Sequence, residues 1–401
     1  MKGLKRIGCL TLIFSILSAS VGYGVEPGEI QSKAAILIEV ETGQVLYSKN
    51  SDDQLPLASI TKLMTYLLAM EAVDSGQVSL EDKVKISPRA ANERGSSYSL
   101  KAGEEIPLRE LIEVMLIISA NDAAFAIAEH VGGTAEDFVA KMNERAMELG
   151  MTATHFLNPN GMPMAEGTNV SSAQDIMILS RHLIEDYGDR ILLVTDKGFY
   201  ENQERKFFKE NTNKLLKQIP EIDGLKTGYT QEAGYCLSST MVSKAKGEDE
   251  EDFRLIVVTF GAATEAERNT DVQKLLTYGH ENYGKQRVIK AGERIAEAYQ
   301  WGMKELPIQL LAKENMVVFG PGEGLIKNTE VRMMPNYSFF IRDGKKLGEL
   351  HITLYDDRIV AVDLVAEEDM ITLPIGMIIG KGWHNMITYI SQFFGWGVSE
   401  G

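Results

Sequence analysis

A chain of 401 residues, 44% hydrophobic and 24% charged, has the composition of an ordinary globular protein of two or three domains. Its formal net charge of −16 argues against nucleic acid as a partner, because an acidic surface does not attract the phosphate backbone. The six histidines are scattered and no H-x-x-x-H or C-x-x-C spacing occurs, so we expect neither a metal site nor a cofactor.

The first 24 residues have the three parts of a Sec signal peptide. Basic residues come first, an apolar run follows, and small residues close the segment, at 2–6, 7–17 and 18–22. The apolar run is too short to span a membrane comfortably, so we expect cleavage between Ala19 and Val25. The mature chain, with a formal charge of −19 once three basic residues are removed, would then lie outside the cytoplasm.

Cysteine usage excludes a disulfide framework. Cys9 lies in the signal segment and precedes most of its apolar run, which is the wrong place for a lipoprotein attachment site. Cys236 is the one cysteine of the mature sequence, so no disulfide can form within it and the fold must rest on its core.

The predicted elements begin with a β-hairpin and a helix. Strands at 34–40 and 44–47 flank a turn, and apolar residues at helical spacing follow in the stretch 56–73. We expect this helix to be buried on one side. Ser59 and Lys62 stand three residues apart near its start, which places both side chains on one face.

Ser59 and Lys62 allow two interpretations. An amine beside a hydroxyl can accept its proton as the hydroxyl attacks, and a helix N-terminus favours the negative charge that develops. The structural alternative is a serine at an N-cap with a solvated lysine one turn later. S-x-x-K alone does not separate them.

The middle of the chain is predicted to be helical. Ser119-Ala120-Asn121 follows one of these helices and precedes the next, so we expect this tripeptide at a helix junction. The segment 154–164 is rich in Asn, Pro and Gly, which predicts a loop. The expected helices cover 108–118, 123–130, a segment capped by Thr134 with Asp137 and closed by Gly150, and 172–184.

Three strands and a closing helix follow. We expect strands at 224–229, 235–242 and 253–260, an acidic turn at 247–252 and a helix at 264–278. Strands at both ends of a helical middle predict an α/β sandwich, with an antiparallel sheet and a helical lobe. Lys226-Thr227-Gly228 lies on the first of these three strands.

The C-terminal third has a different composition. Short alternating strands and turn signals predict a small all-β domain at 286–370, after a main domain at 25–285. In 371–401 an apolar stripe at helical spacing predicts an amphipathic helix on a membrane surface, with packing on its own domain as the alternative. The stripe consists of Trp383, Met386, Ile387, Ile390, Phe393 and Phe394.

The motifs S-x-x-K, S-x-N and K-T-G occur in this order, each in its expected structural context. With them the chain resembles the penicillin-recognising serine acyltransferases, most closely the low-molecular-weight D-alanyl-D-alanine carboxypeptidases of the peptidase S11 type. The resemblance extends from Ala34 to the end, including the small β domain and the C-terminal anchor. It is carried by the runs PLASITK, KAGEE, ISAND, THFLNPNG, DGLKTGYT and AGYC.

This resemblance implies a mechanism. Ser59 would attack the carbonyl between two D-alanines, with Lys62 as base, and release the terminal D-alanine from a peptidoglycan stem pentapeptide. Ser119 would relay a proton to the leaving amine. The resulting acyl-enzyme would be hydrolysed by water, and β-lactams would act as covalent inhibitors.

The resemblance also implies the substrate contacts. Asn121 would hold an amide of the peptide, and Lys226, as a fixed positive charge, would bind the terminal carboxylate together with Thr227. Gly228 and Tyr229 continue this substrate-binding strand. The backbone N–H groups of Ser59 and Tyr229 would hold the oxyanion.

One departure from the family pattern concerns Asn169, which stands where the family often has histidine.

The motifs leave three competing functions open. A class A β-lactamase would use a deacylating glutamate, for which Glu166 is the candidate, although the surrounding loop does not match. The second is a D,D-endopeptidase or transpeptidase of the same fold, and the third is a catalytically silent wall-binding protein.

Overall fold

The computed structural model describes residues 30–300, 308–334, 340–367, 370–371 and 385–387. The expected signal peptide at 1–24 lies outside these residues. The chain forms two compact units. The first unit extends to Lys244 and resumes at Asp252–Asn282, and the second contains Ala245–Glu251 and the residues from Tyr283 onward.

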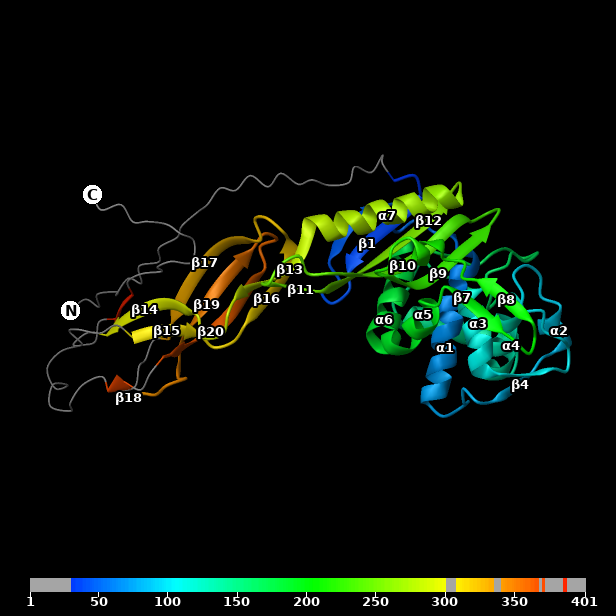
Figure 1. The fold of residues 1–401 in the computed structure, drawn as a ribbon, viewed down its shortest axis with the longest axis horizontal. Helices are drawn as coiled ribbons and strands as arrows, with labels where there is room; N and C mark the ends of the chain where they lie inside the picture. The colour runs from blue at the N-terminus through cyan, green and yellow to red at the C-terminus, as the bar shows by residue number, and fades with distance from the viewer. Residues whose placement is uncertain (1–29, 301–307, 335–339, 368–369, 372–384, 388–401) are drawn as a thin grey trace, which may run out of the picture. The chain divides into compact units, whose positions relative to one another are not determined.

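A five-stranded antiparallel sheet forms the centre of the first unit, and strands from both ends of the unit build it. The strand order is β2-β1-β12-β10-β9. Every residue of β1 is buried, because helices α6 and α7 cover opposite faces of the sheet (Figure 1). The predicted hairpin and antiparallel sheet are confirmed. The elements are β1 (Ala34–Glu39), β2 (Val45–Lys49), β9 (Ile222–Thr230), β10 (Gly234–Ser243), β12 (Phe253–Ala262), α6 (Ala173–Thr195) and α7 (Glu265–Asn282).

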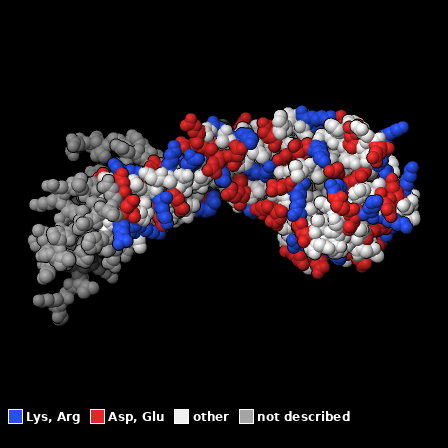
Figure 2. Space-filling model, turned by 60° about the horizontal axis from the view of Figure 1, so that its bottom comes forward, with Lys and Arg blue, Asp and Glu red and all other residues white. Residues whose placement is uncertain are grey.

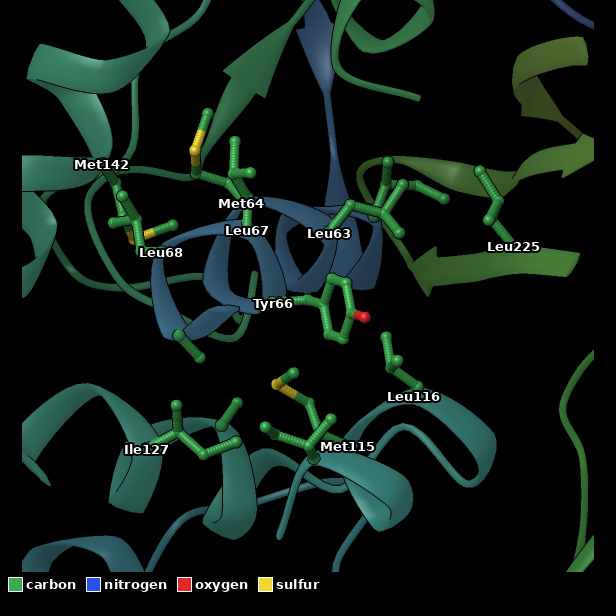
Figure 3. Packing of buried hydrophobic residues seen from close by; sticks show 14 of the residues in the cluster. Leu63, Met64, Tyr66, Leu67, Leu68, Met115, Leu116, Ile127, Met142 and Leu225 are labelled. Carbon is green, nitrogen blue, oxygen red and sulfur yellow. The ribbon is translucent and has the colours of Figure 1, made fainter. Parts of the chain in front are cut away.

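The helical lobe packs around α1 (Lys62–Asp74). Side chains leave α1 in several directions, toward Met115 of α3, Ile127 of α4, Met142 of α5 and Leu225 of β9 (Figure 3). The expectation of burial on one side is therefore wrong, because neighbouring elements enclose α1 from Lys62 to Met70. The lobe also contains α2 (Pro88–Ala91), α3 (Leu108–Ile117), α4 (Asn121–Gly132) and α5 (Ala135–Glu148).

Two helix boundaries show what the sequence pattern could reveal. Thr134 accepts a hydrogen bond from the Asp137 backbone N–H at 3.0 Å, as the capping box predicts. In contrast, α6 continues to Thr195, eleven residues beyond its predicted end. The polar stretch 185–189, with Gly188, interrupts the apolar period there, but packing on β9 and β12 keeps the segment helical.

Short pieces complete the first unit. Hairpin β7–β8 was not predicted, because its strands are short and its loop lacks a strong turn signal. The pieces are β3 (Leu55–Pro56) with β6 (Val170–Ser171), β4 (Lys83–Lys85) with β5 (Glu105–Pro107), β7 (Phe199–Asn202) with β8 (Phe207–Glu210), and the 3₁₀ turns η2 (Ala58–Thr61) and η3 (Lys214–Lys217).

The second unit is all-β in its described residues and has its own hydrophobic core. Its larger sheets have the orders β11-β13-β16 and β17-β19-β20-β15-β14-β22. The segment expected as an acidic turn instead supplies β11 (Glu250–Glu251), which pairs with β13. The remaining strands are β13 (Tyr283–Ile289), β14 (Arg294–Gln300), β15 (Ile308–Ala312), β16 (Met316–Pro321), β17 (Ile326–Met333), β18 (Phe340–Ile341), β19 (Lys346–Leu354), β20 (Ile359–Ala366) and β21 (Met370–Ile371).

The predicted C-terminal helix lies mostly outside the described residues. Its described part, β22 (Asn385–Ile387), is a short strand beside β14 and not a helical turn. Within the described parts of the chain, no helix has the length and apolar character needed to cross a bilayer. Acidic side chains are spread among basic ones over the described surface that Figure 2 shows.

Candidate active site

Ser59 lies in the 3₁₀ turn η2, immediately before α1. The preceding residue, Ala58, has a φ of +46°, which is strained for a residue other than glycine. The N-cap residues of η2 and α1 are Leu57 and Thr61, so Ser59 caps neither helix. The N-cap interpretation of S-x-x-K is wrong, and the Ser59 side chain points to Lys62 instead.

Lys62 is completely buried and its amine contacts three oxygens. Nζ lies 2.7 Å from Ser59 Oγ, 2.7 Å from Asn121 Oδ1 and 2.8 Å from the main-chain oxygen of Asn160. Amide and carbonyl oxygens only accept hydrogen bonds. A neutral Lys62 would donate its two N–H bonds to Asn121 and Asn160, which leaves the nitrogen lone pair for the hydroxyl proton of Ser59.

Burial and a neighbouring charge favour this neutral form. Desolvation is the largest cause that lowers the pKa of Lys62 well below its ordinary value of 10.5, and repulsion from Lys226 lowers it further. Asp122 and Glu93 act in the opposite direction by favouring the ammonium. The environment therefore makes Lys62 a usable base.

Lys226 is also fully enclosed, on β9, and its amine donates a 3.0 Å hydrogen bond to the Thr227 main-chain oxygen. Burial first and Arg268 second lower the pKa of Lys226 from 10.5 to about 7. Burial therefore disfavours the positive charge expected of Lys226, and its role in binding a carboxylate stays a prediction. A carboxylate bound beside it would favour the ammonium and so restore the charge.

The K-T-G strand runs directly against the turn that carries Ser59. A Cβ added to Gly228 would lie 2.9 Å from the Leu57 oxygen and 3.2 Å from the Ile60 nitrogen, so only glycine fits this approach. The Thr227 hydroxyl donates to Thr212 Oγ1 at 2.7 Å. Tyr229 is 55% exposed, and its ring lies 4.3 Å from that of Tyr235.

The S-x-N tripeptide lies at the junction of α3 and α4, as predicted. Asn121 contacts Lys62 directly and donates from Nδ2 to the Arg94 main-chain oxygen at 2.5 Å. Ser119 is buried and has a φ of +64°. Among the described residues its hydroxyl has no hydrogen-bond partner, so a proton relay through Ser119 stays a prediction.

The loop 154–164 contributes more than its sequence indicated. Its Asn160 carbonyl accepts from Lys62, and the Thr65 hydroxyl donates to the Pro159 carbonyl at 2.6 Å. Gly161 has a φ of +84°, and a Cβ there would come within 1.8 Å of the Ala58 oxygen. The loop is therefore in close backbone contact with the residue that precedes Ser59.

Asn169 ties this loop to η2. Its Nδ2 donates to Thr61 Oγ1 at 3.0 Å and to the Asn158 main-chain oxygen at 2.9 Å, while its Oδ1 accepts from the Leu157 N–H at 2.7 Å. Sequence reasoning noted Asn169 only as a departure from the usual histidine. The density of asparagines around a Pro and a Gly was the signal that could have revealed this network.

Glu166, the candidate deacylating glutamate of the β-lactamase alternative, is exposed and has no hydrogen bond to a described residue. Its position therefore does not support that alternative. The described residues also contain no group of three or more His, Cys, Asp or Glu side chains able to hold a metal ion.

Residues 22–264 match the peptidase S11 family, described as D-alanyl-D-alanine carboxypeptidase. The chain belongs to this family. A relative is D-alanyl-D-alanine carboxypeptidase DacF of Bacillus subtilis, 38% identical over 370 residues that cover 91% of this chain and 92% of DacF. The family confirms the resemblance drawn from the three motifs and the serine-hydrolase class that they predict.

Solved structures of family relatives confirm the fold class. A peptidoglycan synthesis regulatory factor, PBP3 of Streptococcus pneumoniae, matches with a TM-score of 0.66 at 27% identity, over 85% of this chain and 99% of PBP3. Penicillin-binding protein D2 of Listeria monocytogenes, in its cefotaxime-bound form, matches with a TM-score of 0.56 at 33% identity. That match covers 63% of this chain and 98% of the Listeria protein.

Proposed function

We propose that the chain is a serine-type D-alanyl-D-alanine carboxypeptidase that removes the terminal D-alanine from peptidoglycan pentapeptide stems. The observation that carries the proposal is the enclosed Lys62 amine, held 2.7 Å from Ser59 Oγ by two acceptors that leave its lone pair for the hydroxyl. A nucleophile and a base in hydrogen-bond contact, with the base oriented by further groups, are the requirement for acyl transfer.

In acylation the Ser59 proton passes to Lys62 as Oγ bonds to the carbonyl carbon between the two D-alanines. The backbone N–H groups of Ser59 and Tyr229 stabilise the oxyanion. The C–N bond then breaks, Ser119 gives its proton to the departing amine and takes up the proton that Lys62 holds, and D-alanine leaves. Water attacks the ester with Lys62 as base, which restores Ser59 and releases the shortened peptide.

Substrate specificity rests on the K-T-G strand. The terminal carboxylate binds Lys226 and Thr227 and draws a proton onto Lys226, because an opposite charge favours the ammonium. Both ends of the Asn121 amide are already bonded, to Lys62 and to Arg94. Asn121 therefore orients the base, and the second N–H of its amide can donate to a carbonyl of the substrate.

β-Lactams would acylate the same serine. Their strained amide presents a carbonyl to Ser59 and a carboxylate to Lys226, and the leaving nitrogen stays tethered after ring opening. The cefotaxime-bound structure of the Listeria relative supports this assignment.

The proposal includes location and domain roles. We place the catalytic domain at 25–285, the small β domain at 286–370 and a membrane-surface attachment at 371–401, after secretion through the signal at 1–24. The sequence patterns of the two terminal segments are the support for secretion and attachment. The protein would then act on the outer face of the cytoplasmic membrane.

Digestion of a synthetic stem pentapeptide, followed by mass spectrometry, tests the activity. Loss of one alanine by the wild type, and no loss by Ser59→Ala, is the expected result. Cleavage or formation of cross-linked dimers without trimming of the pentapeptide would indicate the endopeptidase or transpeptidase alternative.

A further inference from the structure

Glu93 is a half-buried carboxylate next to the site that the mechanism above does not use. It follows helix α2, in a loop whose backbone borders Asn121. The Arg94 oxygen accepts from Asn121 Nδ2 at 2.5 Å, and the Ser96 oxygen accepts from the Asn121 N–H at 2.7 Å. The loop with Glu93 is therefore part of the wall around the base.

Asn160 connects Glu93 to Lys62. Its side-chain Nδ2 donates to Glu93 Oε2 at 2.8 Å, while its main-chain oxygen accepts from Lys62 Nζ at 2.8 Å. Asn160 Oδ1 accepts from the Met162 N–H at 3.0 Å, so both ends of this amide are held. Asn160 is 2% exposed, and water cannot replace these partners easily.

We propose that Glu93 is a positioning residue for the base: it holds the Asn160 carbonyl on Lys62, and its charge raises the pH above which Lys62 can take the Ser59 proton. This inference rests on the proposed function, because it assumes that Lys62 is the base of acylation.

The charges around Lys62 come from three directions. Lys226 on β9 disfavours the ammonium, while Asp122 on α4 and Glu93 favour it. Asp122 already accepts hydrogen bonds from the backbone N–H groups of Tyr98 and Leu100 and from the Ser97 hydroxyl. Glu93 accepts one, from Asn160, and Arg89 attracts it as well. Of the two carboxylates, Asp122 has the larger effect on the pKa of Lys62.

The sign of the effect follows. Removing the Glu93 carboxylate removes a charge that favours the ammonium, so the pKa of Lys62 should fall further. Lys62 would then be neutral, and Ser59 reactive, at a lower pH. Since a direct ionic contact shifts a pKa by roughly 1–3 units and Glu93 acts through one residue, we expect the acidic midpoint of acylation to fall by roughly half a pH unit to one pH unit.

The test is the second-order rate constant for acylation by benzylpenicillin as a function of pH, measured on the full chain. Glu93→Gln keeps the size of the side chain and an oxygen for Asn160, and its acidic midpoint should move to lower pH. Glu93→Asp keeps the charge, and Glu105→Gln removes an exposed carboxylate from β5. Both should keep a midpoint close to that of the wild type.

A merely structural Glu93 predicts another result. Folded Glu93→Gln with a wild-type midpoint, whatever its maximal rate, overturns the inference. If Glu93→Gln does not fold, Glu93→Met provides the same test, because it also removes the charge. If wild-type Ser59 is not acylated at all, the proposed function fails and this inference fails with it. If the wild type is acylated but Glu93→Gln keeps its midpoint, only this inference fails.

Discussion

Lys62 and Lys226 are both enclosed in one site, and the charge of Lys226 is one of the causes that hold the pKa of Lys62 down. Two neighbouring buried amines are unfavourable for the fold, because a protonated amine loses its hydration and repels the other. The same repulsion prepares Lys62 to act as a base. We therefore expect catalysis and stability to depend on Lys226 in opposite directions.

Lys226→Met should stabilise the protein at neutral pH while abolishing turnover. The pKa of Lys226 is about 7 in the folded chain against 10.5 as the ordinary value. Between these values the unfolded chain binds more protons, so wild-type stability should rise with pH, and below about 7 the penalty is fully present. At roughly 1.4 kcal/mol per pKa unit, we expect the variant to gain on the order of 2–5 kcal/mol near neutrality.

Urea unfolding at several pH values measures this gain. The variant should also lose most of the rise in stability that the wild type shows across the window. A variant that is less stable than the wild type at neutral pH, with the same pH dependence, would contradict this prediction. It would show that burial of the Lys226 ammonium does not lower the free energy of unfolding.

Substitutions at Gly161 and Gly103 form a matched pair that tests the contact between Gly161 and Ala58, the residue before Ser59. Both have a φ of +84°, but a Cβ on Gly161 would meet the Ala58 oxygen, whereas nothing lies within 4 Å of one on Gly103. Gly103→Ala should cost about 1 kcal/mol through backbone strain and leave acylation unchanged.

Gly161→Ala adds a collision with the residue before the nucleophile. We expect a larger loss of stability and acylation slower by roughly 10–100-fold, because a small displacement of reacting groups is costly. Thermal unfolding and penicillin acylation rates check both variants. Equal effects of the two substitutions would contradict the role of this contact.

Asn169→Ala tests whether the asparagine network supports the site. The substitution leaves the Leu157 N–H and the Asn158 oxygen without their buried partner, so we expect a loss of roughly 2–4 kcal/mol. Acylation should slow as well, because Asn169 holds Thr61, two residues after Ser59. Asn92→Ala removes an exposed asparagine whose side chain donates one hydrogen bond, to the Pro88 main-chain oxygen. This control should change neither the stability nor the acylation rate. Chemical denaturation measures the comparison, and similar losses in both variants would refute it.

The sequence predicted the parts of the site that side-chain identity encodes. The spacing of Ser59 and Lys62 predicts their contact, and the helix junction places Asn121. It could not show that the Asn160 main chain accepts from Lys62, because any residue has a carbonyl. The pairing of β11 with β13 was equally hidden, since such a contact depends on long-range register and not on local pattern.

The positive φ of Ser119 illustrates a third limit. Ser119 adopts the left-handed region at +64° because the chain must turn sharply between two packed helices. Nothing in the residue type announces that conformation, since serine is an ordinary helix-terminal residue.

The central claim is that Ser59 is the acylated nucleophile, and intact-protein mass spectrometry after incubation with benzylpenicillin tests it most directly. We predict that the wild type gains the mass of one penicillin, that the adduct maps to the peptide containing Ser59, and that folded Ser59→Ala gains none. An adduct that persists in Ser59→Ala, or a folded wild type that forms no adduct, would contradict the account.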